Sequence, residues 1–396
     1  MNNDRWILPE GIEELLPQDA YRIEYLRRQL LDLFSSWGYE LVIPPFLEYT
    51  ESLLTGMGSD LDLQTFKLID QKSGRMMGIR ADMTPQVARI DAHQLGREQP
   101  TRLCYMGTVL RTHADDLSNK RSLMQIGAEL YGHDGVASDI EIIRLMLGML
   151  QRIGLGDIYL DLGHVEIFRG LAKQAELNQQ QEALLFDALQ RKAAPEINDI
   201  LDQARIPAKT QAMLSELIWL NGGAEVLEKA RRSLKAAHSN VHKAIDNLEF
   251  IKTQLAKFNP QIELHFDLAE LRGYHYHTGV VFAAYKSGIG QSIAQGGRYD
   301  HIGEVFGRAR PATGFTADLR TLVEYSGHAI EITPGIFVPN DAADGDEQSL
   351  VEIIDELRAQ GNRVIVALPG QSGEAKVMGC DRKLEKQNDK WVVVKA

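Results

Sequence analysis

A long helical stretch lies between two regions rich in strands, and this order most constrains the fold. Residues from about 166 to 258 have a helical pattern without strand alternation and are polar enough to form an inserted unit. Strand-like runs lie on both sides of it, at 102–111, 122–132, 158–164, 262–268, 279–285 and 291–297. Strands joined by turns or polar loops, with one helical insertion, favour a mixed, mainly antiparallel sheet. The predicted class is therefore α+β and not a doubly wound α/β fold.

End signals predict the limits of two helices in this core. Residues 20–37 carry apolar side chains at helical spacing, and Gly38 follows as a stop. Ser138 and Glu141 have the spacing of a capping box for a second helix, which Gly154 closes.

A second, smaller unit is predicted after the core. We expect the core to cover residues 1–325, a linker to cover 326–334, and an α/β unit to cover 335–396. Its predicted elements are a strand at 336–339, a helix at 346–360, a strand at 363–368, a helix near 374–388 and a strand at 391–394.

Composition excludes several classes of protein. The 396-residue chain contains only Cys104 and Cys380, so a disulfide framework or a thiolate metal site is not expected and a reducing cytoplasm is the natural setting. The formal net charge of -12 disfavours broad nucleic-acid binding, which needs basic surface. No apolar run approaches the roughly 18 residues of a membrane helix, and the N-terminus does not resemble a secretory signal.

The segment 79–89 is the first candidate for binding chemistry. Arg80, Asp82 and Thr84 alternate on one side of an extended segment, and Pro85 then opens a helix. Asp82 could take an ammonium group and Thr84 could add a hydroxyl. Spacing alone favours the simpler interpretation, in which these residues only begin a helix.

A second candidate is one face of the strand at 122–132. Gln125, Gly127 and Glu129 share that face, and Gly127 leaves room between two polar side chains. The face suits a small polar ligand with a positive charge, or it is the solvated side of an antiparallel sheet. The sequence does not separate these two interpretations.

The third candidate is the loop "LRGYHYHTGVVF". His275 and His277 invite a metal interpretation, but no third ligand of firm spacing lies nearby, so a metal site is not favoured. Arg272, next to Gly273 and near aromatic residues, better fits a clamp for a carboxylate or a phosphate.

Together these stretches resemble histidyl-tRNA synthetase, a class II aminoacyl-tRNA synthetase, in order over about residues 5–325. "GYELVIPPFLEYTE" resembles motif 1, the dimer-forming strand; "IRADMT" resembles the family's "LRPEGT"; "QIGAE" keeps its Gln and Glu; "GGRYD" is the second histidyl-specific motif; and "ATGFTADLRTL" resembles motif 3. "LRGYHYHTGVVF" is similar to "VRGLDYYTRTVFE". The resemblance implies histidine contacts at Asp82, Thr84, Arg111, Gln125, Glu129, Arg272, Tyr276 and His277.

The departures fall in the part of the family pattern that holds ATP. Arg111 matches the motif 2 arginine, but His113 replaces a Glu, and Asp115 and Asp116 stand in a loop that is basic in the synthetases. Asn119 stands where an ATP-binding Arg is expected. Losing one donor to a developing phosphate charge costs about 10²- to 10³-fold in rate. We therefore expect adenylation to be lost.

Further changes affect motif 3 and the histidyl-specific loop. Arg320 and Thr321 stand at the positions of the closing Glu-Arg pair of motif 3. His275 and His277 replace an Asp and a Tyr of the loop, and their roles cannot be inferred from the sequence.

The unit at 335–396 resembles a shortened anticodon-binding domain. A histidyl-synthetase-like chain without synthetase chemistry resembles the regulatory subunits of short-form ATP phosphoribosyltransferase. That resemblance implies a non-catalytic dimer, without a cofactor, that joins the short catalytic subunit in a hetero-octamer. It also implies activation of that subunit and feedback inhibition by histidine in the first step of histidine biosynthesis. Asp82, Gln125 and Glu129 would face the ammonium or imidazole group of histidine, and Arg111 and Arg272 its carboxylate. The alternatives are an active histidyl-tRNA synthetase, a ligase for another amino acid, and a scaffold that binds neither histidine nor ATP.

Overall fold

The computed structural model describes residues 6–55, 59–114, 119–274, 276–327, 330, 332–340, 347–371 and 374–396. The chain forms two compact units, Met1–His328 and Ala329–Ala396, each with its own sheet.

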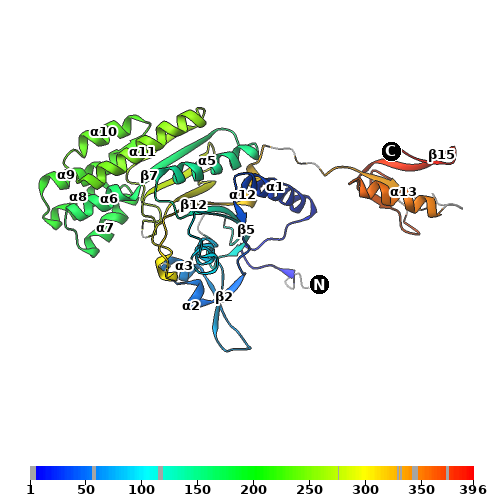
Figure 1. Cartoon of the computed structure of the whole chain (residues 1–396), viewed down its shortest axis with the longest axis horizontal. Coiled ribbons are helices and arrows are strands. Elements are labelled where there is room, and N and C mark those ends of the chain that lie inside the picture. Colours follow the sequence, from blue (N-terminus) through cyan, green and yellow to red (C-terminus); the bar gives the residue numbers. More distant parts are fainter. Residues whose placement is uncertain are drawn as a thin grey trace. The chain divides into compact units, whose positions relative to one another are not determined.

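A nine-stranded sheet forms the centre of the first unit (Figure 1). Its strands, in spatial order, are β1 (Glu40–Leu41), β5 (Thr101–Leu110), β6 (Ser122–Tyr131), β12 (Ala312–Asp318), β11 (Ala294–Arg298), β10 (Val280–Lys286), β7 (Ile158–His164), β9 (Glu263–Asp267) and β8 (Asn221–Gly222). Only the β1–β5 and β7–β9 pairs are parallel, which confirms the prediction of a mixed, mainly antiparallel sheet.

Helices α1 (Pro17–Ser36), α5 (Val136–Arg152) and α12 (Leu319–Tyr325) pack together beside the sheet (Figure 1). Helix α1 approaches β12 through the rings of Phe34 and Phe315, which meet edge to face at 6.0 Å. The strand residues next to Phe315, Gly314 and Thr316, point to the opposite face because side chains alternate along a strand.

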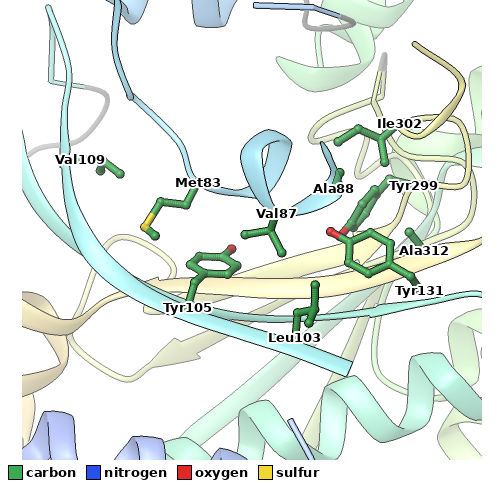
Figure 2. Close-up of a cluster of buried hydrophobic side chains, with 10 residues drawn as sticks. All are labelled: Met83, Val87, Ala88, Leu103, Tyr105, Val109, Tyr131, Tyr299, Ile302 and Ala312. Atoms are coloured by element: carbon green, nitrogen blue, oxygen red, sulfur yellow. The ribbon is translucent and has the colours of Figure 1, made fainter. Parts of the chain in front are cut away.

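That opposite face carries helix α4 (Thr84–Arg89), where Pro85 stands in the first turn as predicted. Val87 and Ala88 of α4, with the preceding Met83, pack against Leu103 and Tyr105 of β5 (Figure 2). The contact buries these apolar side chains completely or nearly so, which fixes the segment that contains Asp82 against the sheet.

A three-stranded sheet leads the chain into α4. Its order is β2 (Leu47–Tyr49), β4 (Met76–Ile79) and β3 (Phe66–Ile69). Arg80 follows β4 and is buried, donating to the backbone oxygens of Pro44 and Thr108 at 2.7 and 2.8 Å. Arg80 therefore anchors the backbone and does not share a polar surface with Asp82.

The helix ends were predicted with mixed success. Gly38 and Gly154 follow the ends of α1 and α5 with positive φ, as expected. The predicted capping box of α5 is wrong, because α5 begins at Val136 and its N-cap residue makes no side-chain cap. Ser138 lies inside the first turn and donates to the Gly135 oxygen, while Glu141 accepts a bidentate ion pair from Arg102.

The inserted unit is helical, as predicted, apart from the two-residue strand β8. Its helices are α6 (Val165–Gln174), α7 (Gln179–Gln190), α8 (Ala194–Ala204), α9 (Ala208–Glu216), α10 (Glu225–Ser233) and α11 (Ser239–Phe258). Strand β8 extends the main sheet by pairing with β9. Within the described part of the chain, no helix is long and apolar enough to cross a membrane.

The second unit is a four-stranded sheet with helix α13 (Glu347–Ala359). Its order is β14 (Val364–Val366), β13 (Gly335–Val338), β15 (Cys380–Gln387) and β16 (Lys390–Lys395). The helix predicted near 374–388 is wrong, since β15 occupies most of that range and pairs with both β13 and β16. Lys- and Glu-rich composition favours a helix, but positive φ at Asn388 and Asp389 makes a tight hairpin turn and tertiary pairing decides the outcome.

Candidate functional site

A cavity of about 660 Å³ lies on the α4 face of the main sheet. Its walls come from helix α3 (Ser59–Gln64), the start of α4, strands β6, β7, β10, β11 and β12, the loops after β9 and β11, and helix α7. Among the predicted histidine contacts, the cavity is lined by Asp82, Thr84, Glu129, Arg272, Tyr276 and His277, whereas Arg111 and Gln125 are not in its lining.

Glu129 is the buried acid of the cavity. Its carboxylate accepts hydrogen bonds from the hydroxyls of Tyr105 at 2.9 Å, Thr84 at 3.2 Å and Tyr299. Burial raises the pKa of Glu129 to about 8, the hydroxyl donors oppose that rise, and the nearby Asp82 carboxylate adds to it. Glu129 is therefore mostly protonated near neutral pH and can donate one hydrogen bond as well as accept others.

Gln125 hydrogen-bonds to Asp82 and does not line the cavity. Its side-chain oxygen accepts from the Met83 N–H at 2.8 Å, and its amide donates to Asp82 at 3.0 Å and to Thr316 at 2.9 Å. The same Asp82 oxygen accepts from the Thr84 N–H at 2.8 Å. The N-cap residue of α4 is Met83 and makes no side-chain cap, so Asp82 is not the helix cap; its carboxylate makes a local contact with Thr84 and also lines the cavity.

The room that Gly127 was expected to leave between Gln125 and Glu129 is filled by the side chain of Tyr105. Gly127 pairs with Tyr105 across the β5–β6 hairpin, and a Cβ at Gly127 would collide with the Tyr105 hydroxyl. The missing side chain makes room for a tyrosine that reaches Glu129. The glycine is required by this internal contact.

Arg272 supplies positive charge at another part of the cavity. Its guanidinium donates to the Tyr285 hydroxyl at 2.7 Å and to the Gln295 side-chain oxygen at 3.1 Å, and lies 3.4 Å from Glu270. Burial works against the charge, but Glu270, Tyr285 and Asp161 outweigh it and raise the pKa of Arg272. The group therefore stays cationic and is held in a defined orientation.

Aromatic rings form the wall next to Glu129. Tyr276 stacks on Tyr299 with 4.9 Å between ring centroids, and His277 meets Tyr276 edge to face. The Tyr276 hydroxyl is buried and has no hydrogen-bond partner among the described residues. The Tyr131 and Thr313 hydroxyls are buried without a partner in the described part of the chain as well, so a missing partner alone does not identify a ligand contact.

His277 is a neutral imidazole. Burial lowers its pKa to about 4, and its Nδ1 lies 3.3 Å from the Arg298 oxygen, to which it donates as the neutral tautomer. No cluster of three or more His, Cys, Asp or Glu residues that could hold a metal is found within the described ranges. His275 lies outside those ranges.

Arg111 lies at the edge of this region. Its backbone bridges to Thr65, and its Nε lies 3.4 Å from the Ala81 oxygen, a long contact. Of the two arginines expected to face a carboxylate, only Arg272 lines the cavity.

Residues at the expected ATP-binding positions make hydrogen bonds within the chain. Asn119 donates to Glu10 at 2.9 Å, and Arg320 donates to the backbone oxygens of Ser122 and Glu13. Thr321 donates to Asp318. His113 is exposed, and Asp115 and Asp116 lie outside the described residues.

Several residues of the site were missed from the sequence. Tyr105 and Tyr299 donate to Glu129, Thr316 holds Gln125, and Phe186 and Gln190 of α7 reach the cavity from the insertion. Pairing the predicted strands at 102–111 and 122–132 could have placed Tyr105 opposite Gly127. Nothing in the sequence placed α7 next to the sheet.

The chain matches two protein families and many individual proteins. Residues 11–322 match the histidyl-tRNA synthetase family, and residues 333–394 match the C-terminal domain of ATP phosphoribosyltransferase subunit HisZ. An ATP phosphoribosyltransferase regulatory subunit of Thioalkalivibrio sulfidiphilus is 57% identical over 99% of both chains. One of Pseudomonas syringae pv. syringae is 56% identical, over 99% of this chain and 98% of that one.

Solved structures support the same assignment. An ATP phosphoribosyltransferase regulatory subunit/histidyl-tRNA synthetase from Bacillus halodurans superimposes with a TM-score of 0.81 at 28% identity, covering 94% of this chain and 95% of that one. A histidyl-tRNA synthetase from Nostoc shares the fold with a TM-score of 0.79 at 18% identity, covering 98% and 97%. The expected class II synthetase-like fold is confirmed, and the chain belongs to the histidyl-tRNA synthetase-like family of ATP phosphoribosyltransferase regulatory subunits, which places it among regulatory and not catalytic subunits.

Proposed function

We propose that this chain activates the short catalytic subunit of ATP phosphoribosyltransferase and makes it sensitive to feedback inhibition by histidine in the first step of histidine biosynthesis. The observation that carries the proposal is the cavity itself. It combines Asp82 and Glu129, the cationic Arg272, and a buried Tyr276 hydroxyl that lacks a partner among the described residues.

Each group of free histidine has a chemically matching part of the cavity. Asp82 and Thr84 suit the ammonium group, and Arg272 suits the carboxylate. Glu129, which can both donate and accept while protonated, suits the imidazole beside the ring of Tyr276. A few charge-assisted hydrogen bonds of about 1.5–3 kcal/mol each would give micromolar affinity.

Gln125 and Arg111 take different parts in this proposal. Gln125 positions Asp82 and does not contact histidine, because it lies outside the cavity lining and both of its amide N–H groups are already used. Arg111 contributes to the surroundings of the cavity and not to its lining. The direct contacts are thus Asp82, Thr84, Glu129, Arg272, Tyr276 and His277.

We further propose that the chain forms a homodimer within a cytoplasmic hetero-octamer with the catalytic subunit, and binds no nucleic acid. Strand β1 is an edge of the main sheet. Leu41 and, just beyond the strand, Ile43 and Phe46 are exposed, with 80% of the Ile43 surface accessible. An unpaired edge with exposed apolar side chains favours pairing with a second copy.

A reconstitution assay tests the functional proposal. The short catalytic subunit is assayed with ATP and phosphoribosyl pyrophosphate, with and without this chain and with and without histidine. We expect stimulation that histidine suppresses. Asp82→Asn should weaken histidine binding by about 10- to 100-fold, the loss of one charge-assisted interaction, while Glu98→Gln serves as an exposed control.

Two further measurements separate the alternatives. Histidine-dependent exchange between ATP and pyrophosphate would instead identify an active synthetase, and exchange with another amino acid would identify a different ligase. Calorimetric titration with histidine addresses the scaffold alternative. If the two chains fail to co-elute and the catalytic rate does not change, the regulatory proposal is wrong.

A further inference from the structure

Helix α7 of the insertion forms part of the cavity wall. Phe186 and Gln190 line the cavity. Glu182, one turn earlier on the same face of the helix, accepts a 2.5 Å hydrogen bond from the Tyr274 hydroxyl. One stripe of α7 therefore meets both the cavity and the loop that carries Arg272, Tyr276 and His277.

Tyr274 is the side chain through which the loop is held. It is 5% exposed, and its ring lies 5.3 Å from those of Phe168 in α6 and Phe186 in α7. The hydroxyl has its partner on Glu182, so the aromatic contact and the hydrogen bond act on the same residue.

Arg169 of α6 makes the second connection. Its Nη2 donates to the backbone oxygens of Tyr274 and His277, both at 3.0 Å, and its guanidinium lies over the Tyr274 ring at 4.9 Å. The two carbonyls bracket Tyr276, the residue whose hydroxyl lacks a partner among the described residues. The insertion thus holds the backbone on both sides of a cavity side chain.

A third connection joins the insertion to the end of β9. Lys192, just beyond α7, forms a 2.7 Å ion pair with Asp267. The loop from β9 to β10 is consequently attached to the insertion at Asp267, before the residues that line the cavity, and at Tyr274 and His277, which are among them.

We propose that the α6–α7 part of the insertion senses cavity occupancy, with Tyr274, Glu182 and Arg169 as positioning residues that hold Tyr276 and His277 against bound histidine. This inference rests on the proposed function and names the element that responds to the ligand. Histidine bound in the cavity restricts the motion of Tyr276 and His277. The contacts of Tyr274 and Arg169 then restrict the motion of α7 as well. Binding and a more rigid α7 are then coupled in both directions.

Hydrogen exchange of the full-length chain, with and without L-histidine, tests the coupling together with calorimetric titration. Histidine should slow amide exchange in residues 179–190 of the wild type. Tyr274→Phe keeps the ring and loses the hydroxyl, so it should weaken histidine binding about 5- to 20-fold and reduce the slowing in α7. Glu182→Ala should do the same.

Two variants on the same helix control the experiment. Glu182→Gln keeps an oxygen that accepts the Tyr274 hydrogen bond, so it should bind nearly as the wild type does. Asp187→Asn removes a carboxylate from an exposed pair with Arg191 and should change neither measurement. Absence of histidine binding to the wild type would overturn this inference together with the proposed function. Wild-type binding without any change in α7 exchange, with Tyr274→Phe binding equally well, would overturn this inference alone.

Discussion

Gly314 of β12 lies directly opposite Glu129 of β6, and the Glu129 carboxylate occupies the space that a Cβ at Gly314 would need. The side chain of Glu129 therefore extends over the neighbouring strand at a glycine, the residue type without a side chain to block it. From there it reaches the hydroxyl of Tyr299. Its position depends on the register of two strands far apart in the sequence.

Gly314→Ala should displace Glu129 and weaken histidine binding. The added methyl group meets both the carboxylate and the Ala128 oxygen, which is backbone and cannot rotate away. Overpacking of this kind costs about 1–3 kcal/mol in the free energy of unfolding. Urea denaturation and histidine titration measure the two effects.

Gly148→Ala is the matched control for that substitution. Gly148 lies in α5, and a Cβ there meets no atom within 4 Å. This change should raise the free energy of unfolding by about 0.5–1 kcal/mol, because alanine favours a helix over glycine. Equal effects of the two substitutions would contradict the steric explanation.

Two buried tyrosine hydroxyls near Glu129, those of Tyr105 and Tyr276, should behave differently when removed. Tyr105→Phe loses the donor to Glu129 and leaves that buried carboxyl with fewer partners. We expect a loss of about 1–2 kcal/mol in the free energy of unfolding. Tyr276→Phe removes a buried hydroxyl without a partner in the described structure, so stability should stay unchanged or rise.

Tyr276→Phe is expected to have a different effect on histidine affinity from its effect on stability. If the ligand supplies the missing partner, Tyr276→Phe weakens histidine binding although the protein itself is no less stable. Chemical denaturation and calorimetry on the same preparations provide both values. A Tyr276→Phe protein that is less stable than Tyr105→Phe would show that the Tyr276 hydroxyl is already satisfied.

The pKa of Glu129 predicts how stability changes with pH. Its folded value of about 8 lies above the ordinary value of 4.5. Between these values the folded protein holds a proton that the unfolded chain has released, so this group destabilises the fold increasingly as pH rises, up to about pH 8. Buried His164 and His277 act in the opposite direction, because burial lowers their pKa to about 3 and about 4. Their contribution rises with pH and is complete above their ordinary value of 6.5.

The interval from about pH 6.5 to 8 therefore isolates Glu129. Across it, the wild type should lose up to about 2 kcal/mol of unfolding free energy relative to Glu129→Gln. Denaturation curves at several pH values measure the difference, with Glu98→Gln as the exposed control. Parallel pH profiles for the wild type and Glu129→Gln would mean that Glu129 is ionised throughout this range.

Local patterns predicted the elements better than they predicted the site. The hairpin of β5 and β6 follows from strand alternation on both sides of a polar loop, and the insertion follows from its helical pattern. The prediction of a helix near the C-terminus failed because β15 has helix-favouring residues. Its pairing with β13 and β16 makes it a strand. That pairing is a tertiary effect which residue preference does not contain.

The sequence predicted which residue types occur near the site, but it did not predict the role of several of these residues. Gln125 belongs to the expected set, but its partners Met83 and Thr316 lie far away in the sequence, so its positioning role needed the fold. Gly127 was expected to leave room between two polar side chains, and its strand partner Tyr105 fills that room. Phe186 could not be placed at all, because helical spacing identifies a face of α7 but not what that face meets.

A buried ion pair close to α4 offers a test of how the cavity face is stabilised. Arg310 and Asp91 are 7% and 1% exposed, and one guanidinium nitrogen lies 2.8 and 3.0 Å from the two carboxylate oxygens. Arg310→Met should cost about 3–5 kcal/mol in unfolding free energy, because it leaves the Asp91 charge buried without its partner. Asp91→Leu combined with Arg310→Met removes both charges and should recover much of that loss. Urea denaturation of the single and double variants measures the coupling. A double variant that loses the sum of the single losses would show that the two residues act independently.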